Sequence, residues 1–221
     1  MNKLNFFQST IGKKILMATT GLLFCFFLLI HLLNNLTLFL GAEEFNTLVK
    51  SLEYIKPLVR VLEFILLIIL VVHISNAFIL NKRSNEARPI KYKINPKDNS
   101  SFSSRTMILS GVIILLFLII HLGTFWRTFQ TIHSHTSYYD IVTKNNLIGF
   151  GNPLITILYM LASIFIGMHL KHGFESSFQT FGIENIKIKN ILNKISIIFW
   201  FFIPFGFFII ALWFGILNKI L

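Results

Sequence analysis

The stretch from Met17 to Leu32 reads MATTGLLFCFFLLIHL, and it is the part of the sequence that best indicates the fold class. It is an apolar run that carries a single histidine, His31, near its end. A helix needs about 20 predominantly apolar residues to cross the hydrocarbon core of a bilayer, and the apolar run here extends over residues 14–40. An ionisable side chain inside such a segment is costly, so its presence indicates a function.

Four further runs have the same apolar character, in a chain of 221 residues of which 54% are hydrophobic. We expect one domain over residues 1–221, an all-α integral membrane bundle of five transmembrane helices, because the apolar runs use most of the chain. The first run is too long for the core of a signal peptide, so it is expected to be retained. The predicted spans are residues 14–40, 58–81, 105–128, 153–180 and 195–217.

The basic residues predict the orientation of the chain in the membrane. The formal net charge is +11, and 13 of the 20 Lys and Arg residues precede the first span or lie between spans two and three or spans four and five. The positive-inside rule then places the N-terminus in the cytoplasm and the C-terminus outside. We expect a multi-pass protein of the cell inner (cytoplasmic) membrane whose basic loops contact anionic lipid, with no nucleic acid partner.

Few cofactor classes are compatible with this chain alone. Cys25 is the single cysteine, whereas an iron–sulfur cluster needs about four thiolates. No glycine-rich nucleotide fingerprint follows a strand pattern, so a flavin or nicotinamide fold is not expected. Redox chemistry on a soluble substrate would therefore belong to a partner protein.

Two histidines are predicted to lie toward the outer face. His31 follows Lys14 by 17 residues, and His121 follows Arg105 by 16 residues. At about 1.5 Å of rise per residue, both lie about 25 Å from the inner ends of their helices.

Two other histidines are predicted to lie toward the inner face. His73 precedes Lys82 by nine residues on a helix that runs inward, and His169 follows Pro153 by 16 residues on another. The depths therefore predict two pairs, His31–His121 and His73–His169. A low-spin haem used for electron transfer has both axial positions filled, so the two pairs predict two bis-histidine haem b sites stacked across the bilayer. Small residues that would let a porphyrin approach the helices, or that would equally serve helix packing, are Gly21, Gly111, Gly167 and Gly173.

An internal repeat supports this arrangement. MATTGLLFCFFLLIHL from Met17 matches MILSGVIILLFLIIHL from Met107 at an offset of 90, and HISNAF from His73 matches HLKHGF from His169 at an offset of 96. Repeats of the same orientation predict two halves related by an axis along the membrane normal. In this alignment His172 matches Asn76, so His169 and not His172 is the expected ligand, and His172 is interpreted as a polar group near the inner haem.

Several motifs resemble those of the cytochrome b558 membrane subunit of succinate dehydrogenase and fumarate reductase, the single-chain type with five helices and two haems. STIGKKILMATTG runs from Ser9 to Gly21 and is followed by the HLLNNL that contains His31. ARP lies at residues 87–89 and SRTM at residues 104–107. HLKHGFESSFQTFG runs from His169 to Gly182 and is the most specific of the set.

The resemblance, which spans roughly residues 9–182, implies a function for the whole chain. The four paired histidines would be the axial ligands of the haem irons. The partners would be a flavoprotein subunit with FAD and an iron–sulfur subunit, both on the cytoplasmic face. Electrons would pass between these partners and a membrane quinone, expected to be menaquinone, in succinate oxidation within the tricarboxylic acid cycle or in fumarate reduction. The chain itself would carry out no dicarboxylate chemistry.

The quinone site needs a proton-handling group near the outer haem. Candidates are Glu63 on span two and Glu43, Glu44 and Asn46 in the first outer loop, although each is also compatible with an interfacial side chain. Lys171 and Glu175 would pair with each other, contact haem propionates or meet the iron–sulfur subunit. His133 and His135 form a surface H-x-H for which weak metal binding is the alternative to plain polar surface.

Two rival functions remain open from the sequence. A dihaem cytochrome b anchor of another respiratory dehydrogenase would share the histidines but lack the quoted motifs. A transporter that uses histidines for protons or a metal would show acidic residues or broken helices at the midplane. Here only Pro204 interrupts a span, and carboxylates are scarce at depth.

Overall fold

The computed structural model describes residues 6–87, 106–131, 137–183 and 185–220, and these residues form helices and no strand. Five helices are long and apolar enough to cross a membrane, so the predicted all-α bundle of five membrane-spanning helices is confirmed. This is the architecture of a multi-pass membrane protein. The spans are Thr10–Leu40, Lys56–Glu86, Met107–Thr131, Pro153–Thr180 and Ile186–Ile220.

The first four spans begin and end close to the predicted residues. Two of them start where a side chain caps the free helix terminus: Ser9 Oγ accepts from Gly12 N, and Asn152 Oδ1 accepts from Leu154 N directly before Pro153. The segments in chain order are α1 (Thr10–Leu36) with η2 (Thr37–Leu40), α3 (Lys56–Glu86), α5 (Met107–His121) with η4 (Leu122–Trp126) and α6 (Arg127–Thr131), and α8 (Pro153–Thr180).

The fifth span is longer than predicted, because it begins at Ile186 and not at residue 195. This first part, IKIKNILNKISI, contains lysines and asparagines, so its hydropathy is too low for it to be predicted as part of a span. The Asn185 side chain caps this helix by accepting hydrogen bonds from the backbone N–H groups of Lys187 and Ile188. Its segments are α9 (Ile186–Ile197), η5 (Ile198–Phe202), α10 (Ile203–Leu212), η6 (Trp213–Leu217) and α11 (Asn218–Ile220). A π-helical turn precedes Pro204, whose ring nitrogen has no hydrogen to donate.

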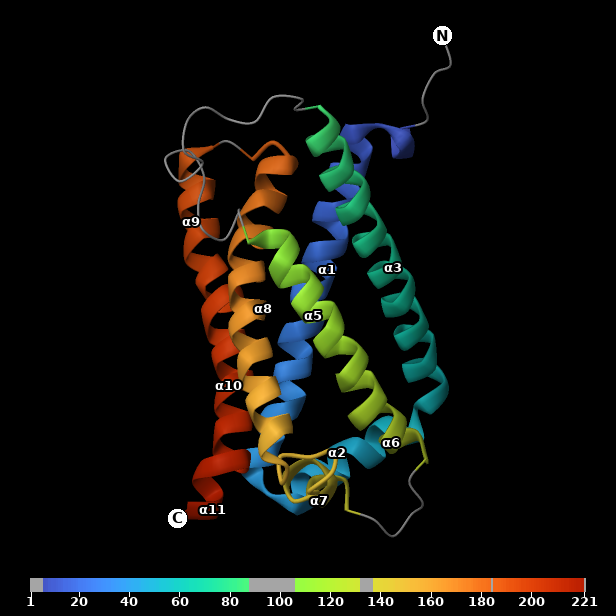
Figure 1. The fold of residues 1–221 in the computed structure, drawn as a ribbon, viewed down its shortest axis with the longest axis vertical. Coiled ribbons are helices and arrows are strands. Elements are labelled where there is room, and N and C mark those ends of the chain that lie inside the picture. The colour runs from blue at the N-terminus through green and yellow to red at the C-terminus, as the bar shows by residue number, and fades with distance from the viewer. Residues whose placement is uncertain (1–5, 88–105, 132–136, 184, 221) are drawn as a thin grey trace.

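Two helices that the sequence analysis treated as loop close one end of the bundle. They are α2 (Ala42–Tyr54), which follows a turn at Gly41 with φ of 120°, and α7 (Tyr138–Thr143). Asn46 joins them, donating from Nδ2 to Ser137 Oγ at 3.1 Å and accepting from Tyr139 N at 3.0 Å. Both lie at the end of the bundle that holds the C-terminus, opposite the N-terminus (Figure 1).

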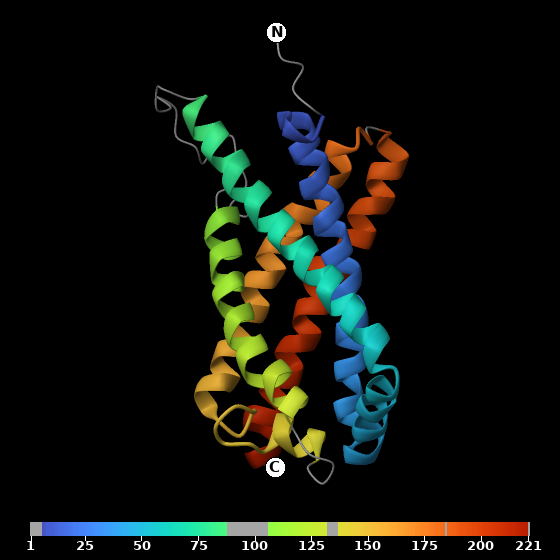
Figure 2. The same cartoon turned by 90° about the vertical axis from the view of Figure 1, so that its right-hand side faces the viewer.

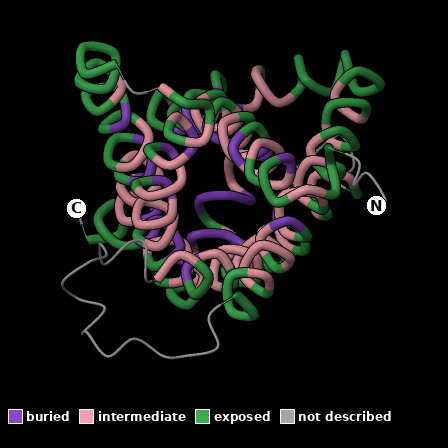
Figure 3. Tube along the Cα trace, turned by 90° about the horizontal axis from the view of Figure 1, so that it is seen from above, coloured by how far each residue is buried: buried purple, intermediate pink, exposed green. Residues whose placement is uncertain are grey.

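The spans surround a central space. α8 packs against α1, α5 and α10, and α1 packs also against α3, so α3 adjoins the α1–α8 pair at α1 and α5 adjoins it at α8. Figure 2 shows α3 running obliquely along α1, and Figure 3 shows the helices in a ring with exposed residues on the outside. Phe64, Leu67 and Ile68 of α3 are among the exposed apolar side chains, as a lipid-facing surface requires. His133, His135 and most of the predicted inner loop over 82–104 lie outside the described residues.

Candidate functional site

A cavity of about 1260 Å³ lies inside the bundle and is lined by residues of α1, α3, α5 and α8 along much of their length. Its lining runs from Lys14 near the N-terminal end of the bundle to Glu53 and Tyr138 near the other end. Pockets for a single small molecule are commonly about 300–1,000 Å³, so this space suits more than one ligand or one very long ligand.

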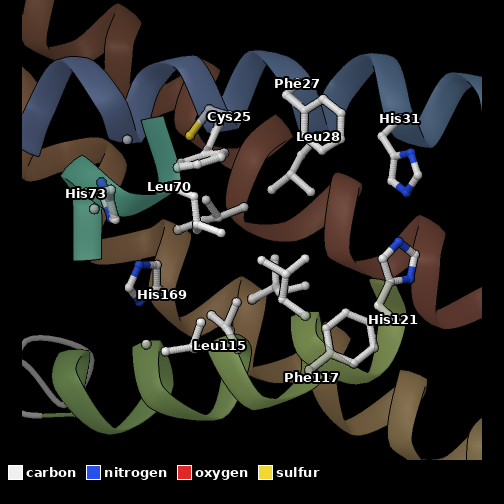
Figure 4. Close-up of a pocket in the computed structure, with 18 of the residues that line it drawn as sticks. Cys25, Phe27, Leu28, His31, Leu70, His73, Leu115, Phe117, His121 and His169 are labelled. Atoms are coloured by element: carbon white, nitrogen blue, oxygen red, sulfur yellow. The ribbon is translucent and has the colours of Figure 1, made fainter. Parts of the chain in front are cut away.

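All four predicted histidines line this cavity, and the structure brings them together in pairs. The ring centroids of His31 and His121 lie 5.9 Å apart, and those of His73 and His169 lie 6.4 Å apart. The two pairs occupy two levels of the cavity, separated by apolar side chains that include Leu28, Leu70 and Leu115 (Figure 4).

The spacing within each pair suits one six-coordinate iron. An imidazole nitrogen binds a first-row transition metal at about 2 Å. Since the ring centroid lies about 1 Å behind that nitrogen, two axial imidazoles have centroids about 6 Å apart across the metal. Both observed separations agree with that value. Among the described residues no group of three or more His, Cys, Asp or Glu side chains is arranged to hold a metal ion, and an iron held by a porphyrin needs only the two axial ligands.

The second nitrogen of each ring has a polar neighbour. Nδ1 of His73 lies 2.9 Å from Thr20 Oγ1, and Nδ1 of His169 lies 3.3 Å from Ser110 Oγ. Nδ1 of His121 lies 2.9 Å from the Tyr159 hydroxyl. In the described part of the chain, the hydrogen bonds of these rings all use Nδ1, which leaves Nε2 for a ligand, as is usual for histidines that bind metals.

The rings of His31 and His121 also lie against aromatic side chains one turn earlier. Phe27 lies 5.3 Å from His31 with an interplanar angle of 14°, and Phe117 lies 5.7 Å from His121 at 31°. The two phenylalanines are equivalent in the internal repeat, at the same offset of 90 as the histidines. The repeat is thus visible in side-chain packing as well as in sequence.

The four glycines predicted near a porphyrin have different surroundings. A Cβ on Gly21 would lie 3.6 Å from His73 Cε1, and one on Gly111 would lie 3.4 Å from His169 Cε1, so these two leave space beside one histidine pair. A Cβ on Gly173 would contact Met107, and Gly173 lines the cavity. Gly167 instead lies against the backbone of Trp200 and serves helix packing, because a Cβ there would come 2.9 Å from the Trp200 carbonyl oxygen.

Glu63 is the one quinone-site candidate that lines the cavity. Its carboxylate accepts from Arg60 Nη1 at 2.5 Å and from Trp126 Nε1 at 3.0 Å, and Arg60 also donates to Gln130. We call these four residues the Glu63 cluster. All four line the cavity, where α3 begins after α2 and where the third span ends, and Trp126 follows His121 by five residues.

The other predicted polar residues are placed elsewhere. Glu43 and Glu44 lie exposed in the first turn of α2, and Asn46 is occupied in joining α2 to α7. His172 is half-buried and lines the cavity, as a polar neighbour of the His73–His169 pair would. Lys171 lies 4.8 Å over the Trp200 ring and forms no ion pair with Glu175 in the described residues, and both side chains lie outside the cavity lining.

Sequence reasoning missed several residues that contact the site. The residues are Thr20, Ser110, Tyr159, Arg60, Trp126 and Gln130. The internal repeat could have indicated the first two, because Thr20 and Ser110 occupy equivalent positions at the offset of 90. The other four could not be predicted, because the sequence does not specify how each helix is rotated about its axis or how deep it lies in the bundle.

Comparisons of the chain with protein-family models, with curated proteins and with solved structures find no match.

Proposed function

We propose that this chain is the membrane-anchor cytochrome b subunit of a succinate:quinone oxidoreductase, which passes electrons between an iron–sulfur subunit and a membrane quinone. The observation that supports this most is the pair geometry: two imidazole pairs at two levels of one cavity, with centroid separations of 5.9 and 6.4 Å. Each separation fits two axial ligands on one iron. Two haems b held by these histidines would supply one-electron transfer across the bilayer.

The chain's own residues would hold and insulate the two haems. His31 and His121 would ligate one iron, and His73 and His169 the other. Apolar side chains line most of the cavity and exclude water, which limits the solvent reorganisation that accompanies electron transfer. Neutral imidazoles, three of them in contact with a hydroxyl, fit this environment, because an isolated charge would be costly there.

The proposed docking of flavoprotein and iron–sulfur partners depends on the motif resemblance, and one structural observation supports it. The stretches STIGKKILMATTG and HLKHGFESSFQTFG lie side by side where α1 begins and α8 ends. A Cβ on Gly21 of the first would lie 4.0 Å from Ser177 Oγ of the second. The two most specific motifs thus meet beside the His73–His169 pair, at the end of the bundle where an electron-donating partner would dock.

The Glu63 cluster would form the quinone site. A quinone takes up two protons with its two electrons, and a carboxylate held by Arg60 and Trp126 at the cavity wall can relay them. The cavity is continuous from this cluster to the His31–His121 pair. That pair would therefore exchange electrons with the quinone.

Reduction of the purified chain by a quinol tests the proposed function. The full chain in lipid nanodiscs, with haem supplied during expression, is mixed anaerobically with a water-soluble menaquinol analogue, and the b-type α-band is followed by stopped-flow absorbance. Rapid reduction of haem is expected. A chain without haem would contradict the proposal as a whole, whereas a haem-containing chain that the quinol does not reduce would contradict the quinone site.

A further inference from the structure

Two buried hydroxyls contact the His73–His169 pair in the same way. Thr20 is 6% exposed and its Oγ1 lies 2.9 Å from Nδ1 of His73. Ser110 is 1% exposed and its Oγ lies 3.3 Å from Nδ1 of His169. Each hydroxyl belongs to a helix other than the one that carries its histidine, so each contact fixes the ring across a helix interface.

The hydroxyl protons in these contacts are already used. Thr20 Oγ1 donates to the Leu16 carbonyl oxygen at 2.7 Å, and Ser110 Oγ donates to the Met107 carbonyl oxygen at 2.9 Å. A hydroxyl has one proton and two acceptor lone pairs. With its proton on that carbonyl, each oxygen has a lone pair directed to accept from the imidazole. This arrangement favours the tautomer with its hydrogen on Nδ1 and leaves the lone pair on Nε2.

The other histidine pair lacks this matched arrangement. Nδ1 of His121 faces the Tyr159 hydroxyl at 2.9 Å. Among the described residues, Nδ1 of His31 has only the Asn35 amide nitrogen at 3.5 Å, and that nitrogen donates to the His31 carbonyl oxygen at 2.8 Å. Helix hydroxyls commonly bond to a carbonyl one turn earlier without further purpose. Here two such hydroxyls occupy equivalent positions of the internal repeat and both contact an imidazole, which simple back-bonding does not explain.

We infer that Thr20 and Ser110 are positioning residues that select the ligating nitrogen of His73 and His169 and raise the basicity of both imidazoles. The inference depends on the proposed function, because the ligand of Nε2 is the iron of a haem b. An acceptor on Nδ1–H pushes electron density toward Nε2 and stabilises ferric iron, so it lowers the reduction potential of that haem.

Redox titration of full-chain variants tests this role. Thr20→Val keeps the shape of the side chain and removes the acceptor, and Ser110→Ala does the same in the other half of the repeat. We expect each variant to raise the midpoint potential of one haem and to change its low-spin EPR signal, with the other haem unaffected. Thr19→Val is the matched control, since Thr19 is the exposed neighbour on the same helix, and it should leave both potentials unchanged.

The conservative variant Thr20→Ser separates the hydroxyl from the packing. Thr20→Ser should restore the wild-type potential, and it should also restore the haem if Thr20→Val loses it through weaker binding. Two unchanged potentials in both Thr20→Val and Ser110→Ala, or a haem loss that Thr20→Ser does not restore, would overturn the inference. A wild-type chain without haem would instead overturn the proposed function on which it depends.

Discussion

The imidazole rings of His31 and His121 lie with their centroids 5.9 Å apart and their planes at 86°. Their helices, α1 and α5, each pack against α8, and the rings meet across the cavity that these helices enclose. His73 of α3 and His169 of α8 repeat the relationship at the other level, 6.4 Å apart at 63°.

Single histidine variants should remove haem selectively. In the proposed assignment, His31→Ala or His121→Ala would remove one axial ligand of the same haem, and His73→Ala or His169→Ala would remove one from the other. We therefore expect the haem-to-chain ratio to fall from two to one. The two groups of variants should leave complementary α-bands in reduced-minus-oxidised spectra.

His172→Ala is the control for these variants. His172 lies on α8 three residues after His169 and lines the same cavity, so its loss tests whether any cavity histidine is needed. It should retain both haems. Retention of both haems by any one of the four ligand variants would remove that residue from the assignment.

Glu63→Gln should impair exchange with quinone and leave haem binding intact. The amide keeps the size of the side chain but cannot carry a proton, and general acid–base catalysis contributes typically about 10²–10⁴-fold. We expect quinol-dependent haem reduction to slow by about 10²-fold or more with two haems still present. Glu43→Gln, an exposed change on α2, is the control. Equal rates for Glu63→Gln and wild type would place the quinone elsewhere.

Gly215→Ala should destabilise the bundle without touching the site. A Cβ at Gly215 would clash with the side chain of Thr156. Thr156 is fully buried and donates to the carbonyl oxygens of Phe150 and Asn152, so its side chain cannot move aside easily. Such overpacking costs about 1–3 kcal/mol. Gly123→Ala is the matched control, with no atom within 4 Å of the added Cβ. Thermal unfolding in detergent compares the two, and equal stabilities would contradict the packing of η6 on α8.

The contact between Tyr138 and Glu53 predicts a pH dependence at the end of the bundle closed by α2 and α7. Tyr138 donates to Glu53 Oε1 at 2.6 Å, and burial together with that carboxylate raises the pKa of Tyr138 to about 12, above its ordinary value of about 10. Because the pKa of the folded state is the higher one, the stabilisation is complete below about pH 10 and is lost as the pH rises through about 12.

Tyr138→Phe removes this stabilisation, so it should be less stable than wild type at pH 7, by about 1 kcal/mol. The difference should shrink between pH 10 and 12, as measured by denaturant unfolding in detergent. Tyr139→Phe, a change at the next residue, is the control and should show no such convergence. A difference that stays constant up to pH 12 would contradict the raised pKa.

The sequence predicted the spans because apolar runs such as Pro153–Thr180 leave few alternatives in a membrane protein. The sequence also predicted which histidines lie at the same level, because the helical rise per residue converts the distance from a helix end along the sequence into a depth in the bundle. It missed α2, whose AEEFNTLVKSLEY is amphipathic and too polar for a hydropathy argument, and the start of α9, for the same reason. The Thr20–His73 contact could not be predicted, because it depends on how α1 and α3 rotate against each other.

Haem stoichiometry tests the central claim most directly. The full chain is purified after expression with haem available, and haem b is quantified from the pyridine haemochrome spectrum alongside the protein concentration. We predict two haems b per chain, with a dithionite-reduced minus oxidised spectrum typical of bis-histidine coordination. A folded chain that contains no haem would contradict the account.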